Sequence, residues 1–398
     1  MVLPPNSPAR LKQSKGTLTY FEKETTIERH FSPLKDPRIE RTKEHKLIDI
    51  ITIAICSVLA MGESWDAMEE FGEANKQWLK QFLELPNGIP SHDTFNRVFS
   101  RIDPDSFRRC FIEWVKSIEP GFDADIISVD GKTVRGSRDK ARGKQAIHLV
   151  SAWSSASSLV LGQVKTEAKS NEITAIPKLI DLLAIKGCVV TIDAMGCQTA
   201  IADKIVEKQG DWVFSLKGNQ GTLHEQVKAH FASRDLDALA TKASVFCQTQ
   251  SKGHGRTETR RYYYLTDHPL SDYADQWRGF HGIGMVESMR QQGKKTSTER
   301  RYFIASLKTD VQSFALAVRN HWGIENSLHW VLDVTFSEDA SRVRKDHAPE
   351  NFSILRHIAL NLLRQDKSSK KKSLKLKRLR AAWDRDYLEQ LLGGLETA

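Results

Sequence analysis

The order of apolar segments between Asp125 and Gly218 constrains the fold of this chain more than any other feature. Three short apolar runs come first and are separated by turns: IISVDG, AIHLVSAW and LVLGQVK. Two amphipathic segments and two further apolar runs then alternate: EITAIPKLIDLLAIKG, CVVTIDA, TAIADKIVEKQG and DWVFSLKG. Apolar runs joined by turns predict antiparallel strands, whereas strands that alternate with helices predict a mostly parallel remainder of the same sheet.

Three antiparallel strands followed by helix, strand, helix and strand are the order of a ribonuclease-H-like core. Its missing last helix is supplied by FALAVRNHWGIENSLHWVLDV, which follows the strand YFIASL and precedes a second long helix, NFSILRHIALNLLRQ. Between these parts, residues 225–298 contain the runs SVFCQTQ, TETRRYYYL and HGIGMVESMR, which predict a β-rich insertion. We therefore expect an α/β fold, in which a ribonuclease-H-like core is interrupted by this insertion and preceded by helices.

The rest of the chain divides into an arm, a helical domain and a tail. Residues 1–35 mix Pro, Ser, Lys and Glu without a period and predict a flexible arm. Helical periodicity then predicts an all-helical N-terminal domain over residues 36–120, followed by the two parts of the core over 121–224 and 299–365. Residues 366–398 form a basic tail. The arginines of the helical domain suit a solvated helix face, which we favour, or DNA binding.

The excess of positive charge indicates an acidic partner without deciding which one. Lys and Arg outnumber Asp and Glu by 59 to 50, which gives a net charge of +9. Nucleic acid is the partner that fits best, but on charge alone a generic soluble surface explains the excess equally well. The densest positive run, DKSSKKKSLKLKRLR, suits either contacts to phosphate groups or a solvated tail.

The sequence has no feature that is typical of a secreted or membrane-embedded protein. MVLPPNSPARLKQSKG lacks the apolar stretch of a secretory signal, and the apolar run from Leu47 to Met61 contains Asp49 and is short for a membrane span. The five cysteines are widely spaced, with no CxxC pair to suggest zinc or redox chemistry. We expect reduced thiols and a cytoplasmic protein, associated with the nucleoid when bound to DNA, with no membrane partner.

Two aspartates occupy equivalent places in apolar strands, and a glutamate on the last core helix accompanies them. The strand IISVD ends on Asp130, and Asp193 lies near the carboxyl end of the strand VVTID. A single aspartate at a strand end is usually a turn former or helix cap, but ligands collect at this end of the strands in open α/β sheets. Glu325 has His321 and His329 four residues before and after it. Its carboxylate is either a surface group or the third ligand of a metal site.

Three such carboxylates suit phosphodiester chemistry. Cleavage by water and transfer to a 3′ hydroxyl both require charge to be neutralised on the attacking and leaving oxygens, which two metal ions achieve. Oxygen ligands favour Mg²⁺, with Mn²⁺ as an alternative. In this arrangement Asp130 would bridge both ions, Asp193 would bind one of them and Glu325 the other. Other acids that flank the same elements compete for these roles: Asp123, Asp125, Asp333, Glu338 and Asp339.

Six motifs occur together in this chain: SVDGKTVRGS, KSNEITAIPKLI, TIDAMGCQTAIA, FSLKGNQ, HGRTETRR and RNHWGIENSLHWVLDVTFSEDASRVR. On these motifs the chain resembles, over nearly its whole length, the H-repeat-associated family of bacterial insertion-sequence DDE transposases. The resemblance implies the catalytic triad Asp130, Asp193 and Glu325, with cleavage and strand transfer at the ends of a transposable element. The implied partners are double-stranded DNA, as terminal inverted repeats and target, and a second copy of the chain in a synaptic homodimer. Related transposases often have Arg and Lys on the last helix, where this chain has His321 and Leu332.

Charged and polar residues in loops and beside the acids are candidates for contacts to phosphate groups or base edges. Each of them also suits an ordinary surface position. The candidates are Lys132, Arg135, Lys217, Asn219, Gln220, His254, Arg256, His329, Arg342 and Arg344.

Two other functions are compatible with the sequence. A transposase-derived DNA-binding protein would keep the fold without catalysis, although the presence of all three acids argues against simple decay. A metal-dependent nuclease would use the same core without strand transfer. Cleavage and joining assays separate these classes.

Overall fold

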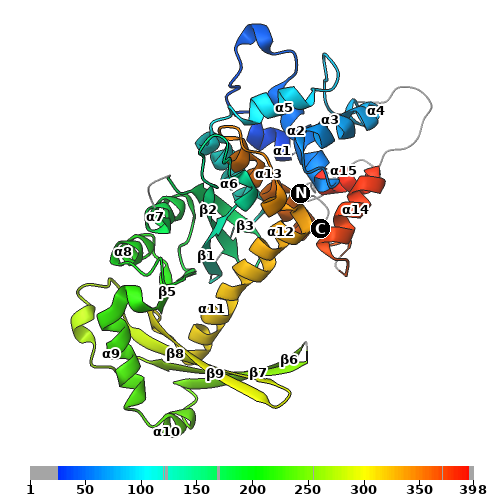
Figure 1. The fold of residues 1–398 in the computed structure, drawn as a ribbon. Coiled ribbons are helices and arrows are strands. Elements are labelled where there is room, and N and C mark those ends of the chain that lie inside the picture. The colour runs from blue at the N-terminus through cyan, green and yellow to red at the C-terminus, as the bar shows by residue number, and fades with distance from the viewer. Residues whose placement is uncertain are drawn as a thin grey trace, which may run out of the picture.

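The computed structural model describes residues 26–119, 121, 124–167, 171–253, 255–369 and 371–393, and in them nine strands form one sheet (Figure 1). The spatial order of the strands is β3-β2-β1-β4-β5-β9-β8-β7-β6. Their bounds are β1 Ile126–Thr133, β2 His148–Ser154, β3 Val160–Lys165, β4 Val189–Ile192, β5 Asp211–Leu216, β6 Phe246–Gly253, β7 Arg256–Leu265, β8 Gly282–Gln292 and β9 Lys295–Ala305. The fold is mixed α/β, as the sequence predicted. Most of the predicted arm, residues 1–25, lies outside the described residues.

The first five strands have the order and directions that the apolar runs predicted. β1, β2 and β3 pair antiparallel, whereas β1, β4 and β5 pair parallel. Helix α7 (Glu172–Leu182) links β3 to β4, and helix α8 (Thr199–Glu207) links β4 to β5. Parallel neighbours need such crossovers because the end of one strand and the start of the next lie at opposite edges of the sheet. This part of the sheet carries Asp130 on β1 and Asp193 directly after β4, close to one edge.

The predicted insertion extends the core sheet and does not form a sheet of its own. β9 pairs antiparallel with β5, and β8, β7 and β6 follow as successive antiparallel neighbours. Two helices precede these strands, α9 (Gly221–Ala232) and α10 (Leu236–Ala240), which the strand-rich prediction did not include. β9 begins before the predicted boundary at residue 298 and ends after it. Its residues Tyr302–Ala305 pair with both β5 and β8. The core and its extension are therefore one hydrogen-bonded layer.

Helices cover both faces of the core strands. α7 lies on one face, where a Cβ on Gly131 would meet the carboxylate of Glu172. α11 (Val311–Gly323) lies on the other face and contacts β1, β4 and β7. It continues through a π-helical turn (Ile324–His329) into α12 (Trp330–Phe336). Figure 1 shows α11 running from the outer strands towards the helical part of the molecule, so one helical rod connects the two regions.

Helices from both ends of the chain pack together at the far end of α12 (Figure 1). Their bounds are α1 Thr26–Phe31, α2 Leu47–Leu59, α3 Trp65–Ala74, α4 Lys76–Leu79, α5 His92–Phe99, α6 Pro104–Ile118, α13 Ala348–Gln365, α14 Leu374–Trp383 and α15 Arg385–Gly393. Much of the predicted basic tail is thus folded as α14 and α15. Arg378 is fully buried and donates to the Val58 carbonyl at 2.7 Å, and Lys377 donates to the Leu363 carbonyl at 2.8 Å. Two of the basic residues of the tail are therefore structural.

Helix α2, with the apolar sequence LIDIITIAICSVL, is a core helix of this region. Its Asp49 is buried and accepts a hydrogen bond from the Leu85 N–H at 3.0 Å, while burial raises the pKa of this carboxyl. Cys56 is also buried in α2, and it and the other four cysteines are free thiols. Across the described ranges, no helix combines the length and the apolar character that crossing a bilayer requires.

Candidate active site

Asp130 and Asp193 lie side by side where two parallel strands part. The pairing of β1 with β4 ends at Val129 and Ile192, the residues that immediately precede the two aspartates. The prediction that the first strand ends at Asp130 is wrong, because β1 continues to Thr133 in its antiparallel pairing with β2. Asp130 is nevertheless at the end of the parallel ladder. The Asp193 carboxylate accepts the backbone N–H of Met195 at 3.0 Å, which orients it at the start of the following loop.

The π-helical turn brings Glu325 and His329 to Asp130. His329 Nδ1 lies 3.0 Å from Glu325 Oε2 and 3.8 Å from Asp130 Oδ2. One ligand atom from each of these three residues lies within 4.8 Å of the other two. π-Helical turns inside α-helices are rare and occur frequently at functional sites, because the extra residue redirects the side chains of that turn. The local sequence IENSLH gave no signal for this geometry.

The three predicted carboxylates line one cavity of about 650 Å³. Asp130, Asp193 and Glu325 come from β1, from the end of β4 and from the π-helical turn. The opposite wall comes mainly from β5, the loop after it, α9 and β9. The residues contributed by that wall include Ser215, Leu216, Lys217, Gly218, His224, Glu299, Arg300, Arg301, Tyr302 and Phe303. The cavity therefore has an acidic side and a side rich in basic and aromatic groups.

The protonation of the carboxyls differs with their surroundings. Burial raises the pKa of Asp130 to about 6, against the opposing effects of the His329 ring and of the Gly131 N–H at 2.8 Å. The carboxylates of Asp193 and Glu172 add to this increase. The hydrogen bond from His329 instead lowers the pKa of Glu325, whose side chain is 58% exposed. A cation that approached this group would favour the ionised form of Asp130.

His321 joins α11 to the strands that carry the two aspartates. Its Nδ1 lies 3.0 Å from the Thr191 hydroxyl on β4, which donates to the Ser128 hydroxyl on β1 at 3.2 Å. Ser128 in turn donates to the backbone carbonyl of Asn320 on α11 at 3.3 Å. Burial lowers the pKa of His321 to about 4, so the ring is neutral at physiological pH. This polar chain fixes the helix of Glu325 against the strands of Asp130 and Asp193.

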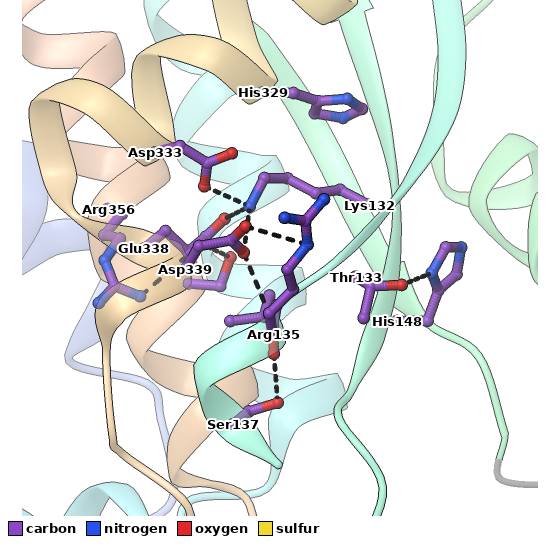
Figure 2. A network of polar contacts seen from close by, with 12 residues as sticks. Lys132, Thr133, Arg135, Ser137, His148, His329, Asp333, Glu338, Asp339 and Arg356 are labelled. Atoms are coloured by element: carbon purple, nitrogen blue, oxygen red, sulfur yellow. Dashed lines mark hydrogen bonds and ion pairs between the residues drawn. The ribbon is translucent and has the colours of Figure 1, made fainter.

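Lys132, a predicted DNA contact, directs its ammonium group into a cluster of acids (Figure 2). Its Nζ lies 2.7 Å from Asp333 Oδ1, 3.0 Å from Glu338 Oε2 and 3.3 Å from Asp339 Oδ1. We call these four residues the Lys132 cluster. Burial acts to lower the pKa of Lys132, but Glu338 and Asp333 outweigh it and the pKa is raised. The side chain is 10% exposed, so its ammonium group compensates part of the negative charge of the cluster and is not presented at the surface.

Four of the five acids that competed for the metal-binding roles are engaged elsewhere. Asp333, Glu338 and Asp339 belong to the Lys132 cluster. Asp125 is buried and accepts hydrogen bonds from the Ser154 hydroxyl and from the Ala156 N–H, so it closes the turn after β2. Asp123 lies outside the described residues.

Asn219 and Gln220, two further predicted DNA contacts, brace the loop that carries Asp193. Asn219 donates from its side-chain amide to the Ala194 carbonyl, and Gln220 donates to the Cys197 carbonyl at 2.9 Å. They connect the segment after β5 with the segment after β4. Sequence reasoning placed them at a loop but missed this positioning role.

The remaining predicted contacts are dispersed. Lys217 is exposed and lines the cavity, whereas His329 is 4% exposed and faces the carboxylates. Arg135 is exposed, with its Nε 3.5 Å from Asp339 Oδ2, and Arg256 is exposed at the tip of the β6–β7 hairpin. Arg342 is exposed beyond α12, and Arg344 donates to the Gly136 carbonyl at 2.9 Å. His254 lies outside the described residues.

A second polar group lies beneath Asp130 on the other face of β1. His148 Nε2 is 2.7 Å from Glu172 Oε1, and its Nδ1 is 2.8 Å from the Thr133 hydroxyl. A Cβ on Gly131 would lie 2.1 Å from the Glu172 oxygen and 2.4 Å from the His148 ring. A side chain at position 131 would therefore displace this hydrogen-bonded pair. The motifs around these residues gave no indication of the contact, because it joins three separate segments.

Comparison with known proteins places the chain among transposases. Residues 121–362 match the family model described as the transposase DDE domain, and residues 28–115 match its associated model. The chain is 43% identical over 371 residues to the H repeat-associated putative transposase YhhI of Escherichia coli K12, covering 92% of this chain and 97% of that protein. It is 44% identical over 367 residues to the putative transposase YncI of E. coli O157:H7, covering 91% and 93%.

Shorter and more distant matches accompany these relatives. The inactive transposase YbfQ of E. coli K12 is 43% identical over 72 residues, which are 18% of this chain and 86% of that protein. A solved synaptic complex of the piggyBac transposase with hairpin DNA matches with a TM-score of 0.40 and 13% identity over 93% of this chain and 76% of that one. Since the family model spans more than half of the chain and the identity to YhhI extends along nearly all of it, this protein belongs to the H-repeat-associated transposases of the DDE family.

Proposed function

We propose that this protein binds the ends of a bacterial insertion sequence and catalyses metal-dependent cleavage and strand transfer of DNA. The observation that carries the proposal is that Asp130, Asp193 and Glu325, from three distant segments, line one cavity. The strand order β3-β2-β1-β4-β5, antiparallel and then parallel, supports a ribonuclease-H-like core around them. Membership of the DDE transposase family supports the reaction class.

The donor set fits divalent metal ions. Asp130, Glu325 and His329 can each direct a ligand atom to a common point, and Asp193 lines the same cavity. Carboxylate oxygens suit Mg²⁺, and a neighbouring imidazole makes Mn²⁺ equally acceptable. We propose that Asp130, Asp193 and Glu325 hold two ions, which when bound supply charge neutralisation for the attacking and leaving oxygens.

The chain's own groups would orient the DNA around these acids. Lys217, Arg300 and Arg301 line the facing wall, where their positive charge would position a phosphodiester backbone without reading its sequence. His321 and the chain of hydroxyls behind it would keep the two aspartates and Glu325 at fixed separations. Because an element has two ends and each chain has one such cavity, we propose a homodimer in the synaptic complex, acting on terminal inverted repeats and target DNA in the cytoplasm.

Substitution of Asp193 tests the assignment of the acids. Asp193→Asn should abolish Mg²⁺-dependent nicking of a duplex that carries the terminal repeats read from the element's genomic flanks, with duplex binding unchanged. Asp203→Asn, an exposed change on α8, is the matched control and should nick at the wild-type rate. Undiminished nicking by Asp193→Asn would refute the assignment.

Joining assays separate the proposal from its alternatives. Given pre-cleaved ends and a supercoiled target plasmid, a transposase yields joined product, whereas a nuclease of the same fold yields none. A catalytically silent relative would bind the ends but neither nick nor join them. Either of these results would replace the proposed function.

A further inference from the structure

His329 brings a nitrogen donor to the carboxylates. It comes from the same π-helical turn as Glu325, and its Nδ1 lies 3.0 Å from Glu325 Oε2 and 3.8 Å from Asp130 Oδ2. The side chain of His329 is 5% exposed, whereas that of Glu325 is 58% exposed. The imidazole is therefore shielded from bulk water, which would otherwise compete for its nitrogen.

The polar contacts of this ring are confined to Nδ1. The other ring nitrogen, Nε2, is buried and has no hydrogen-bond partner within the part of the chain that the structure describes. A buried polar side chain lowers stability unless its polar atoms are bonded. Stability alone therefore gives no sufficient reason for a histidine at this position. The role of the ring lies at Nδ1, beside the two carboxylates.

The three donor atoms are spaced like ligands of one metal ion. Adjacent ligands of an octahedral ion, each about 2.1 Å from it, lie about 3.0 Å apart, and opposite ligands lie about 4.2 Å apart. The 3.0 Å between His329 Nδ1 and Glu325 Oε2 matches an adjacent pair. The 3.8 Å to Asp130 Oδ2 lies between the two values. Small side-chain rotations would therefore suffice to place all three atoms around one cation.

The other imidazoles near the cavity are less suitable donors. His321 Nδ1 lies 3.0 Å from the Thr191 hydroxyl, and His224 belongs to the facing wall. Among the described residues, neither is part of the group whose ligand atoms lie within 4.8 Å of one another. His329 is therefore the nitrogen donor that the fold brings to Asp130 and Glu325.

We propose that His329 Nδ1 is a ligand of the ion that Asp130 and Glu325 hold. The inference rests on the proposed function, since it adds a nitrogen to a metal site that this function requires. The ion between Asp130 and Asp193 would have carboxylate ligands only, so the two metal positions would differ chemically. Imidazole favours transition-metal ions over Mg²⁺, and Mn²⁺ accepts both kinds of ligand. His329 thus sets the metal preference of one position.

Pulsed electron paramagnetic resonance of bound Mn²⁺ tests the nitrogen ligand directly. The sample is the full chain with Mn²⁺ and without DNA, and the electron spin echo is modulated when a ¹⁴N nucleus is coordinated to the ion. The wild type should show this modulation, and His329→Gln should lose it. Glutamine can still donate a hydrogen bond to Glu325 but offers no nitrogen ligand. His224→Gln, which removes an imidazole from the facing wall, is the matched control and should keep the modulation.

Calorimetric affinities for the two ions separate a ligand from a positioning residue. His329→Gln should weaken Mn²⁺ binding by about tenfold and Mg²⁺ binding by less than about threefold, because Mg²⁺ gains little from nitrogen. A residue that only oriented Glu325 would weaken both ions equally when replaced. His224→Gln should bind both ions like the wild type, and both variants should keep the wild-type unfolding midpoint.

Three results would overturn the inference. Modulation retained in His329→Gln would place the nitrogen ligand elsewhere, and equal weakening of both ions would reduce His329 to a positioning residue. A wild type that bound Mn²⁺ without nitrogen modulation would likewise refute the ligand. Each of these results leaves the three carboxylates as the proposed metal site. A wild type that bound neither ion would also overturn the inference, and the proposed function would fail with it only if Mg²⁺-dependent nicking were absent as well.

Discussion

Replacement of Lys132 by methionine removes the positive charge from the Lys132 cluster and keeps the length of the side chain. Glu338 is the critical partner, because its side chain is 1% exposed and cannot recover water, whereas Asp333 and Asp339 are 34% and 26% exposed. Removing one partner of a buried ion pair destabilises a fold by about 3–5 kcal/mol. In the variant Glu338 still has a second cation beside it, Arg356 Nη1 at 3.7 Å. We therefore expect a loss of stability at the lower end of this range, about 3 kcal/mol.

Urea unfolding of Lys132→Met, followed by far-ultraviolet circular dichroism, measures this loss. Arg135→Met is the matched control, since Arg135 is 83% exposed and also faces Asp339, and an exposed pair contributes about 0–1 kcal/mol. The second variant Glu338→Gln removes the buried charge that Lys132 neutralises. In a double-mutant cycle with Lys132→Met, the losses of the two single variants should not add, because both remove a partner of the same buried ion pair.

A role of Lys132 in DNA binding would give a different result. If Lys132 were a phosphate contact, Lys132→Met would leave stability unchanged, weaken binding to DNA of any sequence and reduce the salt dependence of binding by about one phosphate. Stability within about 0.5 kcal/mol of the wild type, combined with such a change in binding, would refute the structural role. The measurement therefore decides between the sequence prediction for Lys132 and the position that the structure gives it.

Two further predictions concern pH and packing. Burial lowers the pKa of His357 to about 4, so below about pH 6.5 the unfolded chain binds a proton that the folded chain excludes, and stability falls as the pH drops. Protonation of this imidazole in the unfolded chain should lower the free energy of unfolding by about 2 kcal/mol between pH 7 and pH 5. His357→Leu should remove this loss from urea unfolding curves. A variant that lost as much stability as the wild type between the two pH values would contradict the prediction. Gly131→Ala should destabilise by about 1–3 kcal/mol because its Cβ would meet Glu172, whereas Gly218→Ala, with no atom within 4 Å, should not. Equal thermal midpoints of the two variants would disprove this packing argument.

Local patterns suffice to predict the first five strands and the position of two aspartates. The runs around Asp130 and Asp193 are short, apolar and separated by turns or amphipathic helices, so neighbouring residues alone determine their secondary structure. The parallel order then brings both strand ends to one edge of the sheet. Glu325 is different, because its approach to Asp130 depends on a π-helical turn that the helical periodicity of its segment does not contain.

Contacts between distant segments account for what the sequence could not predict. Lys132 has the character of a surface lysine in its own motif, and its burial follows from three acids about 200 residues later. Arg378 belongs to the most basic run of the chain, but its guanidinium is buried because Val58 and Glu63 lie beside it in the folded structure. The pairing of β9 with β5 is equally remote, so the extended strands gave no indication that they continue the core sheet.

That pairing has a mechanical consequence. The acidic wall of the cavity is attached to β1 and β4, and the basic, aromatic wall is attached to β5 and β9, all within one backbone hydrogen-bond ladder. Spreading the two walls apart would stretch the ladder of β4 with β5, between Val189–Ile192 and Asp211–Phe214, to which β9 is joined by its pairing with β5. Helix α11 contacts both β4 and β5. The distance between the two walls of the cavity is therefore fixed. Under the proposed function, the DNA rather than the protein must then deform on binding. The DNA distortions that cost the least free energy will decide which strands enter the cavity completely.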